Sequence, residues 1–276
     1  MLEIPESHVL AEQITQTLAQ KTIMEAKAAS SPHGLAWYRG DPADYDDLLT
    51  GHTINNAQAL GGQVEIKAGS MRLLLHDGIN VRYYKPGEKL PDKHQLMLRF
   101  SDESALVCTV AMYGGMQAYE AGSNDNYYYE VACKCPNPLT DTFNEEHFAA
   151  LIRLAGPKLS VKALLATEQR IPGLGNGCLQ DILFKAGLNP QTKLLSLREG
   201  DMLLLFNSLK ETLKAMAKGG GRNTEKDLFG QPGGYRTILS NKTYSEPCPV
   251  CGSAILRKAY LGGNVYFCLQ CQPLLT

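Results

Sequence analysis

Four cysteines near the end of the chain have the spacing of metal ligands. Cys248 and Cys251 are separated by two residues, sixteen residues follow, and Cys268 and Cys271 repeat the two-residue gap. A gap of two residues lets both thiolates of a pair reach one ion, and Zn²⁺ binds four thiolates tetrahedrally. Four sulfur ligands leave the metal no open position, so we predict one structural zinc ion rather than a catalytic one.

A second segment has the composition of an anion site. Residues 168–187, EQRIPGLGNGCLQDILFKAG, place Pro172 and two glycines between the end of one predicted helix and the start of another near Asn176. The backbone amides at a helix start, with an asparagine side chain beside them, suit a phosphate oxygen. A plain helix-to-helix connection with Asn176 as the N-cap explains the same residues. Both interpretations stay open at this point.

The N-terminus is the third candidate for chemistry. Glu3 and Glu6 lie close in sequence to the α-amine of Met1. An α-amine has a reference pKa of about 8, so a useful fraction is unprotonated at neutral pH. Such an amine can attack a carbonyl carbon or a sugar C1′ to form a Schiff base, while a carboxylate moves protons. The alternative is an inert terminus with two glutamates near a helix start.

The elements that would position these residues fall into two groups. Residues 5–20 predict a helix with apolar residues at four-residue spacing. Residues 62–130 hold short β-rich runs broken by turn-forming pairs, which predicts an antiparallel sandwich or barrel. A linker rich in Pro, Asn and Thr follows at 135–143, and the hydrophobic period then becomes helical. Residues 253–267, between the cysteine pairs, predict two strands around a Gly-Gly turn.

Charge is divided unevenly along the 276 residues. Residues 1–150 hold 11 Lys and Arg against 20 Asp and Glu, whereas residues 151–276 hold 16 against 8. A basic C-terminal half suggests contact with a polyanion, although ordinary surface variation explains the same numbers. A chain with 44% hydrophobic and 20% charged residues is not disordered, collagen-like or coiled coil. Without an apolar run of eighteen residues or an evident export signal, we expect a cytoplasmic protein that does not enter a membrane.

Taken together and in this order, these segments resemble the formamidopyrimidine-DNA glycosylase and endonuclease VIII family of base-excision-repair enzymes. The resemblance rests on LEIPE at 2–6, on EQRIPGLGN at 168–176, and on SEPCPVCG and YFCLQCQ around the cysteines. It implies an α+β fold, with an N-terminal β-sandwich domain, flanking helices, and a C-terminal helix-two-turn-helix domain with a four-cysteine zinc finger. The predicted bounds are 1–134 for the β-sandwich domain, 135–143 for the linker, 144–243 for the helical domain and 244–276 for the zinc-ribbon finger.

The resemblance implies a monomeric, nucleoid-associated DNA glycosylase that binds damaged duplex DNA, flips the lesion out and cleaves its N-glycosidic bond. The family's nucleophile is the amine of a proline exposed by removal of the initiator methionine. Leu2 stands at that position here, which argues against the AP-lyase step. The amine would belong to Met1, or to Leu2 after processing. Glu3 would act as acid/base, and Glu6 would orient the terminus or activate a water.

The resemblance also implies contacts with the phosphates of DNA. Asn176 would bind phosphate, together with Arg222 and Tyr235 of the glycine-rich basic loop at 219–236. The family carries a phosphate-binding lysine on a β-hairpin. We match that hairpin to residues 67–75, where Lys67 or Arg72 would substitute.

Two further departures from the family remove positive charge. The segment that fills the gap left by a flipped base corresponds to residues 111–119, where Tyr113 and Met116 would be the wedges and no arginine is present. The hairpin of the finger has Gly262, Gly263 and Asn264 where the family has an arginine. Two alternatives therefore stay open: a damaged-DNA-binding protein that has lost catalysis, and a repurposed glycosylase acting on an unusual nucleic acid such as RNA or crosslinked DNA.

Overall fold

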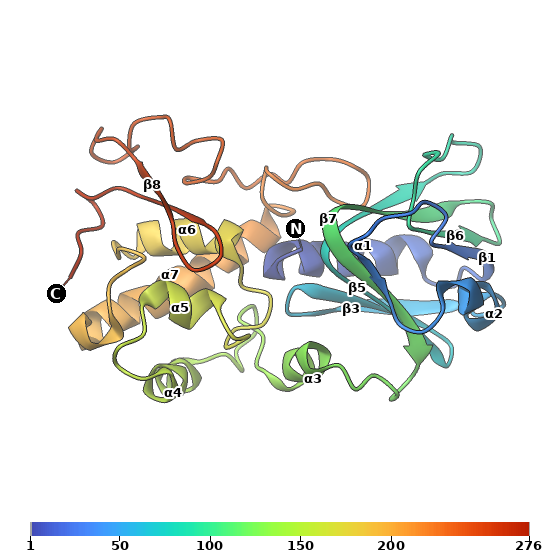
Figure 1. Cartoon of the computed structure of the whole chain (residues 1–276), viewed down its shortest axis with the longest axis horizontal. Coiled ribbons are helices and arrows are strands. Elements are labelled where there is room, and N and C mark those ends of the chain that lie inside the picture. The colour runs from blue at the N-terminus through green and yellow to red at the C-terminus, as the bar shows by residue number, and fades with distance from the viewer. Residues whose placement is uncertain (1, 276) are drawn as a thin grey trace.

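The computed structural model describes residues 2–275, so the amine expected on Met1 lies outside the described residues. A β-rich domain and a helical domain lie side by side along the longest axis, and the N-terminal helix starts at their junction and runs along the sheet of the β-rich domain (Figure 1). The predicted α+β class is confirmed. Within residues 2–275, no helix combines the length and the apolar composition needed to cross a membrane.

The elements of the β-rich domain are α1 (Ile4–Leu18), β1 (Ile23–Ala28), β2 (Ala36–Tyr38), η1 (Pro42–Asp44), α2 (Tyr45–Leu49), β3 (Ile54–Leu60), β4 (Gln63–Ala68), β5 (Met71–Tyr84), β6 (Leu96–Phe100), β7 (Ala105–Glu120) and α3 (Tyr127–Lys134). Those of the helical domain are α4 (Glu145–Ala155), α5 (Val161–Ala166), α6 (Asn176–Lys185), η2 (Leu194–Ser196), α7 (Glu199–Lys218), β8 (Leu256–Ala259) and β9 (Asn264–Phe267).

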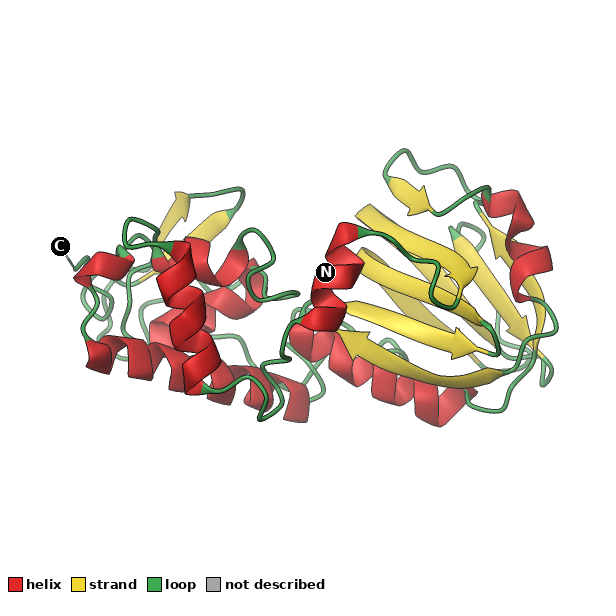
Figure 2. Cartoon of the chain, turned by 90° about the horizontal axis from the view of Figure 1, so that it is seen from below, coloured by secondary structure: helices red, strands yellow, loops and turns green. Residues whose placement is uncertain are grey.

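The strands of the β-rich domain form one curved sheet in the order β1-β6-β7-β5-β4-β3, with β2 added parallel to β7 (Figure 2). The long strands β5 and β7 pair along most of their length, and a bulge interrupts their register between Asp77 and Ile79. On one side of the bulge β5 also pairs with β4, and on the other side β7 pairs with β6. The two layers of the sandwich are therefore parts of one continuous sheet, and β5 and β7 extend from one layer into the other.

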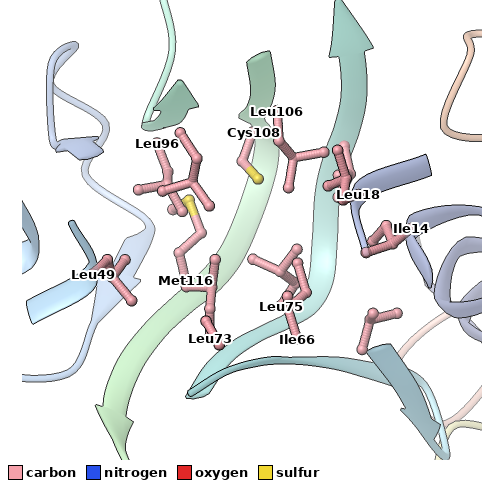
Figure 3. Close-up of a cluster of buried hydrophobic side chains, with 14 of the residues drawn as sticks. Ile14, Leu18, Leu49, Ile66, Leu73, Leu75, Leu96, Leu106, Cys108 and Met116 are labelled. Atoms are coloured by element: carbon pink, nitrogen blue, oxygen red, sulfur yellow. The ribbon is translucent and has the colours of Figure 1, made fainter. Parts of the chain in front are cut away.

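The helix α1 belongs to the cores of both domains. The four-residue spacing that predicted it places Leu10, Ile14 and Leu18 on one face, where all three are buried against the sheet (Figure 3). Ile4, at the first turn, is buried instead in the core of the helical domain. Burial of each such side chain stabilises the fold by about 1.5–3 kcal/mol. The start of the chain is thus fixed at the junction of the two domains.

A loop of the helical domain returns to the sheet. Leu228, in the glycine-rich loop at 219–236, is fully buried in the β core, although its number falls within the range predicted for the helical domain. Its backbone amide donates to Gln13 Oε1 (3.0 Å), and Gln13 Nε2 donates to Asp227 Oδ2 (2.9 Å). Figure 1 shows this orange segment reaching over to the β-rich domain. The loop therefore forms a second tie between the domains beside α1.

Candidate functional site

The carboxylate of Glu3 is buried at the start of α6. Its Oε2 accepts hydrogen bonds from the backbone amides of Gly175 (3.1 Å) and Cys178 (2.9 Å), and its Oε1 accepts one from the amide of Gly177 (2.9 Å). The first amides of a helix lack partners within the helix and carry partial positive charge, so an anion is favourable there. One of the two interpretations left open by the sequence placed a phosphate at these amides, and the chain's own carboxylate occupies them. Asn176 is the first helical residue rather than the N-cap.

Arg222 joins Glu3 to Glu6. Its Nη1 donates to Glu3 Oε1 (3.1 Å), its Nη2 to Glu6 Oε2 (2.8 Å), and its Nε and backbone amide to Glu6 Oε1 (2.9 and 3.1 Å). The three residues are 2–5% exposed. Gly177 makes room for them, because a Cβ there would lie 1.4 Å from Arg222 Nη1. Arg222 is therefore not available for the phosphate contact predicted from the sequence, since its guanidinium is enclosed and paired.

The pKa shifts of Glu3 and Arg222 keep both side chains ionised. Burial alone would raise the pKa of Glu3, but Arg222 and the hydrogen bonds from Cys178 and Gly177 outweigh it, so the pKa lies below its usual value. Burial opposes the charge of Arg222, yet Glu3, Cys178 and Glu6 raise its pKa well above the usual value. The four hydrogen bonds that Glu3 accepts use the capacity of its two oxygens. This arrangement does not support the predicted acid/base role of Glu3, and Glu6 is likewise committed to Arg222.

Leu2 brings the start of the chain to the contact between the domains. Its backbone nitrogen donates to the carbonyl oxygen of Asp77 (2.8 Å), and that of Ile4 donates to the carbonyl oxygen of Gly173 (3.1 Å). The turn between β3 and β4 closes the same contact, because a Cβ on Gly173 would lie 1.9 Å from the backbone nitrogen of Gly62. The first residues therefore cross from the sheet to the helical domain along a fixed path.

A pocket of about 510 Å³ opens beside Leu2. On its wall, His76 Nδ1 lies 2.8 Å from Asp77 Oδ2 and His76 Nε2 lies 3.0 Å from Gln117 Nε2. A carboxylate only accepts hydrogen bonds, so Nδ1 carries the proton and Nε2 accepts from the Gln117 amide. The imidazole is thus held in one tautomer. The pocket is lined by Leu2, Trp37, Leu60, Gly62, Gln63, Leu74, His76, Asp77, Gln117, Asn126, Tyr128, Gln169, Pro172 and Gly173.

A groove of about 590 Å³ also reaches Glu3, and its lining includes Asn176, Arg257 and Asn264. The Oδ1 atom of Asn176 is buried and has no hydrogen-bond partner among residues 2–275. Gly263 lies directly against this side chain, because a Cβ on it would be 2.3 Å from Asn176 Nδ2. Asn176 and the turn of the hairpin therefore lie in contact at one groove, as the sequence predicted for two elements that share one strand of phosphates.

Two buried side chains attach the hairpin to the helical domain. Lys162 of α5 is buried, and its Nζ donates to the carbonyl oxygen of Tyr260 in the hairpin turn. Burial lowers the pKa of Lys162. Gln180 of α6 donates to the carbonyl oxygen of Asn264 (3.0 Å) and accepts from the amide of Tyr266 (3.1 Å). The position of the hairpin relative to α6 is therefore set by hydrogen bonds as well as by the fold of the cysteine module.

The four cysteines at the base of the hairpin form one cluster. Their sulfur atoms all lie within 4.8 Å of one another. Cys248 and Cys271 are 3.7 Å apart, and Cys251 and Cys268 are 3.4 Å apart. A tetrahedral zinc ion with Zn–S bonds of about 2.3 Å places its sulfurs roughly 3.8 Å apart. The four residues can therefore hold a metal ion, and β8 and β9 form the two-stranded hairpin predicted between the pairs.

Lys67 and Arg72 lie at the wrong end of their hairpin for the predicted role. Lys67 Nζ donates to Gln58 Oε1 (2.9 Å), and Arg72 Nη1 donates to backbone carbonyls at the turn between β4 and β5. The turn beside Leu2 is instead the one at Gly62, at the other end of β4. The six residues of β4 span roughly 20 Å. The match of the family's lysine hairpin to residues 67–75 therefore places these cations away from the terminus.

Residues 111–119 belong to the strand β7 rather than to a loop. Met116 is fully buried in the β core (Figure 3), so it cannot act as the predicted wedge without leaving that core. Tyr113 lies against Trp37, with ring centroids 5.8 Å apart. The exposed methionine of this strand is Met112, which is 70% exposed. Strict alternation along a strand would place both methionines on one face, but the register of β7 against β5 is irregular between Val110 and Gly114, and only Met116 is buried.

Tyr235 supports the loop at 219–236 from within. Its backbone nitrogen donates to the carbonyl oxygen of Gly221 (3.1 Å) and its carbonyl oxygen accepts from Asn223 (2.8 Å). Its ring is half-buried, with Lys185 Nζ 5.3 Å from the centroid. Sequence reasoning missed the pocket beside Leu2, because His76 on its wall belongs to no sequence motif.

The comparisons with known proteins agree with this architecture. Residues 135–227 match the family model described as "Formamidopyrimidine-DNA glycosylase H2TH domain". A formamidopyrimidine-DNA glycosylase of Cytobacillus firmus is 25% identical, covering 99% of this chain and 100% of the relative. That of Bacillus licheniformis is 27% identical, covering 84% of this chain and 86% of the relative.

Solved structures share the whole fold. Lactococcus lactis Fpg in complex with DNA containing an abasic site has a TM-score of 0.82 at 22% identity, covering 98% of this chain and 99% of that one. The MutM (Fpg) protein of Thermus thermophilus has a TM-score of 0.80 at 23% identity, covering 99% of each chain. Fold and site thus define a two-domain protein of the helix-two-turn-helix class with a four-cysteine module. The family-model match over residues 135–227 and the near full-length relatives at 25–27% identity make the chain similar to formamidopyrimidine-DNA glycosylases along its whole length.

Proposed function

We propose that this protein is a DNA N-glycosylase that binds damaged duplex DNA and removes the damaged base. The observation that carries the proposal is the placement of the chain's start. The cluster of Glu3, Glu6 and Arg222 holds Leu2 at the junction of the domains, between a pocket of about 510 Å³ and a groove of about 590 Å³. Named relatives of nearly full length are formamidopyrimidine-DNA glycosylases, and the Lactococcus lactis structure holds abasic-site DNA.

In this proposal the terminal amine is the nucleophile. It attacks C1′ of the damaged nucleotide, the C1′–N bond breaks, and the base leaves with the bonding electron pair and takes up a proton. The attacking nitrogen loses a proton to give an aminal; the C1′–O4′ bond then breaks, O4′ takes up a proton, and the nitrogen lone pair forms the C1′=N bond of the Schiff base. Leu2 nitrogen donates to Asp77, so with Met1 retained the reacting amine is one residue further out than the family's proline. We therefore expect base removal with little strand scission.

The buried cluster supplies position and fixed charge. Glu3 carries a negative charge close to the terminus, which favours positive charge that develops on the sugar as the base leaves. Glu3 does not exchange protons, since Arg222 and the amides of α6 occupy its oxygens. A proton for the leaving base must come from a group in the pocket or from water.

The groove at Asn176 would hold the phosphates. Asn176 is uncharged and fixed by Gly263, so it would place a strand rather than provide long-range attraction. Lys218, at the end of α7, and Lys226, in the loop at 219–236, are exposed and would be further phosphate partners. We assign the metal of the cysteine cluster as zinc, because four thiolates in tetrahedral spacing suit Zn²⁺. It would hold the hairpin against α6. Nucleoid association and a monomeric state remain part of this proposal.

A second candidate is a protein that binds damaged DNA without catalysis. It is favoured by the saturated carboxylate of Glu3 and by the turn at Gly61 and Gly62, which places no cation beside the terminus. In this case the groove would still bind DNA, while the pocket would not complete a reaction.

Borohydride trapping separates the two candidates. Purified protein is incubated with duplexes that contain one 8-oxoguanine, one 5-hydroxyuracil or one abasic site, with and without borohydride, and with its α-amine free or acetylated. A covalent adduct that acetylation abolishes supports the proposed reaction. Binding to these duplexes without adduct and without released base supports the binding protein. Absence of binding to any damaged duplex overturns both. Intact mass determines whether the trapped amine belongs to Met1 or Leu2.

A further inference from the structure

The helix α3 is attached to the β-rich domain by few contacts. Of its eight residues only Ala132 is buried, and the neighbours Tyr127 and Tyr128 are 66% and 55% exposed. An isolated helix of this length is unstable in water, because its few hydrogen bonds do not offset the cost of forming the first turn. The helix therefore keeps its structure only while it is docked on the rest of the protein. Figure 1 shows it, in green, at the side of the β-rich domain that faces the helical domain.

One hydrogen bond holds α3 to the sheet. The hydroxyl of Tyr129 donates to Glu65 Oε2 (2.7 Å), and within residues 2–275 no other hydrogen bond joins α3 to a strand. Glu65, on β4, is 2% exposed and also accepts from Tyr119 Oη (2.8 Å) and Gln58 Nε2 (2.9 Å). A hydrogen bond to a buried carboxylate is stronger than one between neutral groups. Burial and the bond to Glu65 raise the pKa of Tyr129, so its hydroxyl stays a donor.

A leucine on the outer face of the sheet is covered at the same place. Successive residues of a strand point to opposite faces, so Leu73 and Leu75 of β5 enter the core, whereas Leu74 points outward. Leu74 pairs with Glu65 of β4 and is only 1% exposed. On an open sheet an outward leucine would be largely exposed. Its burial beside Glu65 therefore indicates that α3 and the adjoining side chains cover it.

The first residues of α3 form part of the wall of the pocket beside Leu2. Asn126, the N-cap of α3, and Tyr128 line that pocket together with Leu74. Part of the remaining lining comes from the helical domain, at Pro172. Release of α3 from the sheet would therefore remove a piece of the wall and uncover Leu74.

The chain is held on either side of α3. Before the helix, Arg39 Nη2 donates to the carbonyl oxygen of Ser123 (2.8 Å) and Arg39 Nη1 donates to Asp125 Oδ1 (2.9 Å). After the helix, the linker joins the core of the helical domain at Leu139. The two ends are thus fixed, while the helix between them depends on the bond from Tyr129.

The two domains are held together more firmly than α3 is held to the sheet. Arg222 makes four hydrogen bonds to Glu3 and Glu6 at the junction, and Leu228 is enclosed in the β core. Separation of the domains would break all of these contacts, whereas release of α3 breaks one hydrogen bond to the sheet. Among the elements around the pocket, α3 is therefore the one that moves at the lowest cost in free energy.

We propose that α3 is a lid of the pocket beside Leu2 and that the hydrogen bond from Tyr129 to Glu65 is its latch. In the structure the lid is docked on the sheet. Its release widens the pocket and lets a molecule enter or leave without separation of the domains. Tyr129 is a positioning residue, since it acts through α3 and not on a bound molecule. The inference goes beyond the proposed function, because it holds whatever molecule the pocket receives.

Two cysteine reporters in the free protein test the lid. Leu74→Cys places a thiol under α3, and Leu73→Cys places one in the core on the other face of the same strand, at a position that is equally buried. Each is made in the wild type and in Tyr129→Phe, which keeps the ring against Tyr119 and removes only the hydroxyl. Alkylation by iodoacetamide is followed by peptide mass spectrometry. In Tyr129→Phe, alkylation at position 74 should become at least about tenfold faster, the effect of one hydrogen bond to a charged group on the open population. At position 73 the rate should not change.

Amide hydrogen exchange gives a second readout without cysteine substitutions. In Tyr129→Phe, the backbone amides of residues 127–134 should exchange at least about tenfold faster, whereas those of α1 should keep their rates. Tyr127→Phe removes an exposed hydroxyl of the same helix and should leave all rates unchanged. If Tyr129→Phe folds poorly, Glu65→Gln weakens the same bond from the strand, because its oxygen is uncharged. It should accelerate exchange in the same segment.

The outcomes decide between a lid and a general contribution to stability. No acceleration at position 74, or none in residues 127–134, overturns the lid. Equal acceleration at positions 73 and 74, or in α1 as much as in α3, also overturns it, because Tyr129 would then stabilise the whole domain. Either result leaves the proposed function in place, since no nucleic acid takes part in the measurements.

Discussion

Replacement of Arg222 by methionine tests whether the buried cluster fixes the start of the chain. Arg222 is 2% exposed and makes hydrogen bonds to both Glu3 and Glu6, each of which is also buried. Removing one partner of a buried ion pair costs about 3–5 kcal/mol, because an uncompensated charge remains. For Arg222→Met two carboxylates lose their partner, so the free energy of unfolding should fall by at least that amount. The melting temperature should drop by roughly 10 °C.

The dependence on pH identifies the cause. The pKa of Glu3 is depressed in the folded protein, so its contribution to stability is complete above the ordinary value of 4.5 and is lost as pH falls through the folded value. In Arg222→Met burial remains without the guanidinium, so the pKa of Glu3 should rise instead. The stability difference between wild type and variant should therefore be largest near pH 7 to 8. It should shrink below about pH 5, as the unpaired carboxylates protonate.

Urea unfolding followed by circular dichroism at several pH values measures both effects. The matched control is Arg236→Met, an exposed arginine of the same loop, which should change stability by about 0.5 kcal/mol or less. The combined variant Glu3→Gln, Glu6→Gln and Arg222→Met removes all the charges and should recover part of the loss. A loss below about 1 kcal/mol for Arg222→Met, or a loss independent of pH, would falsify the assignment of this cluster as a paired, ionised clamp.

Three further predictions concern the groove and the hairpin. Asn176→Ala should weaken binding to damaged duplex DNA about tenfold in a fluorescence anisotropy titration, and the slope of log affinity against log salt should stay the same because no charge is removed. Lys162→Met should loosen the hairpin turn at Tyr260 and weaken DNA binding with the metal retained, whereas an unchanged affinity would show that Lys162 does not set the docking of the hairpin. Elemental analysis should find one zinc ion per chain, and Cys268→Ser should lose it and lower the affinity for DNA. A chain that binds DNA equally well after loss of its metal would contradict that role for the cysteine module.

Local patterns in the sequence predicted the elements well. The four-residue spacing of Leu10, Ile14 and Leu18 placed α1, and the cysteine spacing placed the cluster and its hairpin. These features depend on residues that are close in sequence, so periodicity and ligand geometry are enough to find them. The assignment of Lys67 and Arg72 depended instead on contacts between residues distant in sequence. To decide whether the β3–β4 turn or the β4–β5 turn lies beside Leu2, one must know which end of the sheet meets α1, and local patterns do not give this.

The pairing of Arg222 with Glu3 and Glu6 could not be predicted from local sequence patterns, because it too joins residues that are distant in sequence. Arg222 lies more than two hundred residues from Glu3 and sits in a glycine-rich basic loop, a composition that favours an exposed phosphate contact. Its burial follows from the return of that loop to the sheet, where Leu228 is enclosed in the β core. The apolar pair Leu228 and Phe229 in this basic loop was the available signal, but it does not say which partner Arg222 meets.

The segment PGLGNG, residues 172–177, has the amides of an anion site, but the anion bound there differs from the one considered from the sequence. One of the two interpretations of the sequence placed a phosphate at the first amides of α6, and the anion found there is the carboxylate of Glu3. A side chain at Gly177 would clash with the guanidinium of Arg222, and one at Gly173 would clash with the turn at Gly62. These glycines therefore allow close contacts inside the protein rather than the approach of a phosphate. A phosphate at this segment can therefore be reached only by the side chain of Asn176, whose Oδ1 has no partner within residues 2–275. In the proposed function, phosphate recognition by Asn176 and the fixing of the terminus by Glu3 would share one helix start without competing for the same donors.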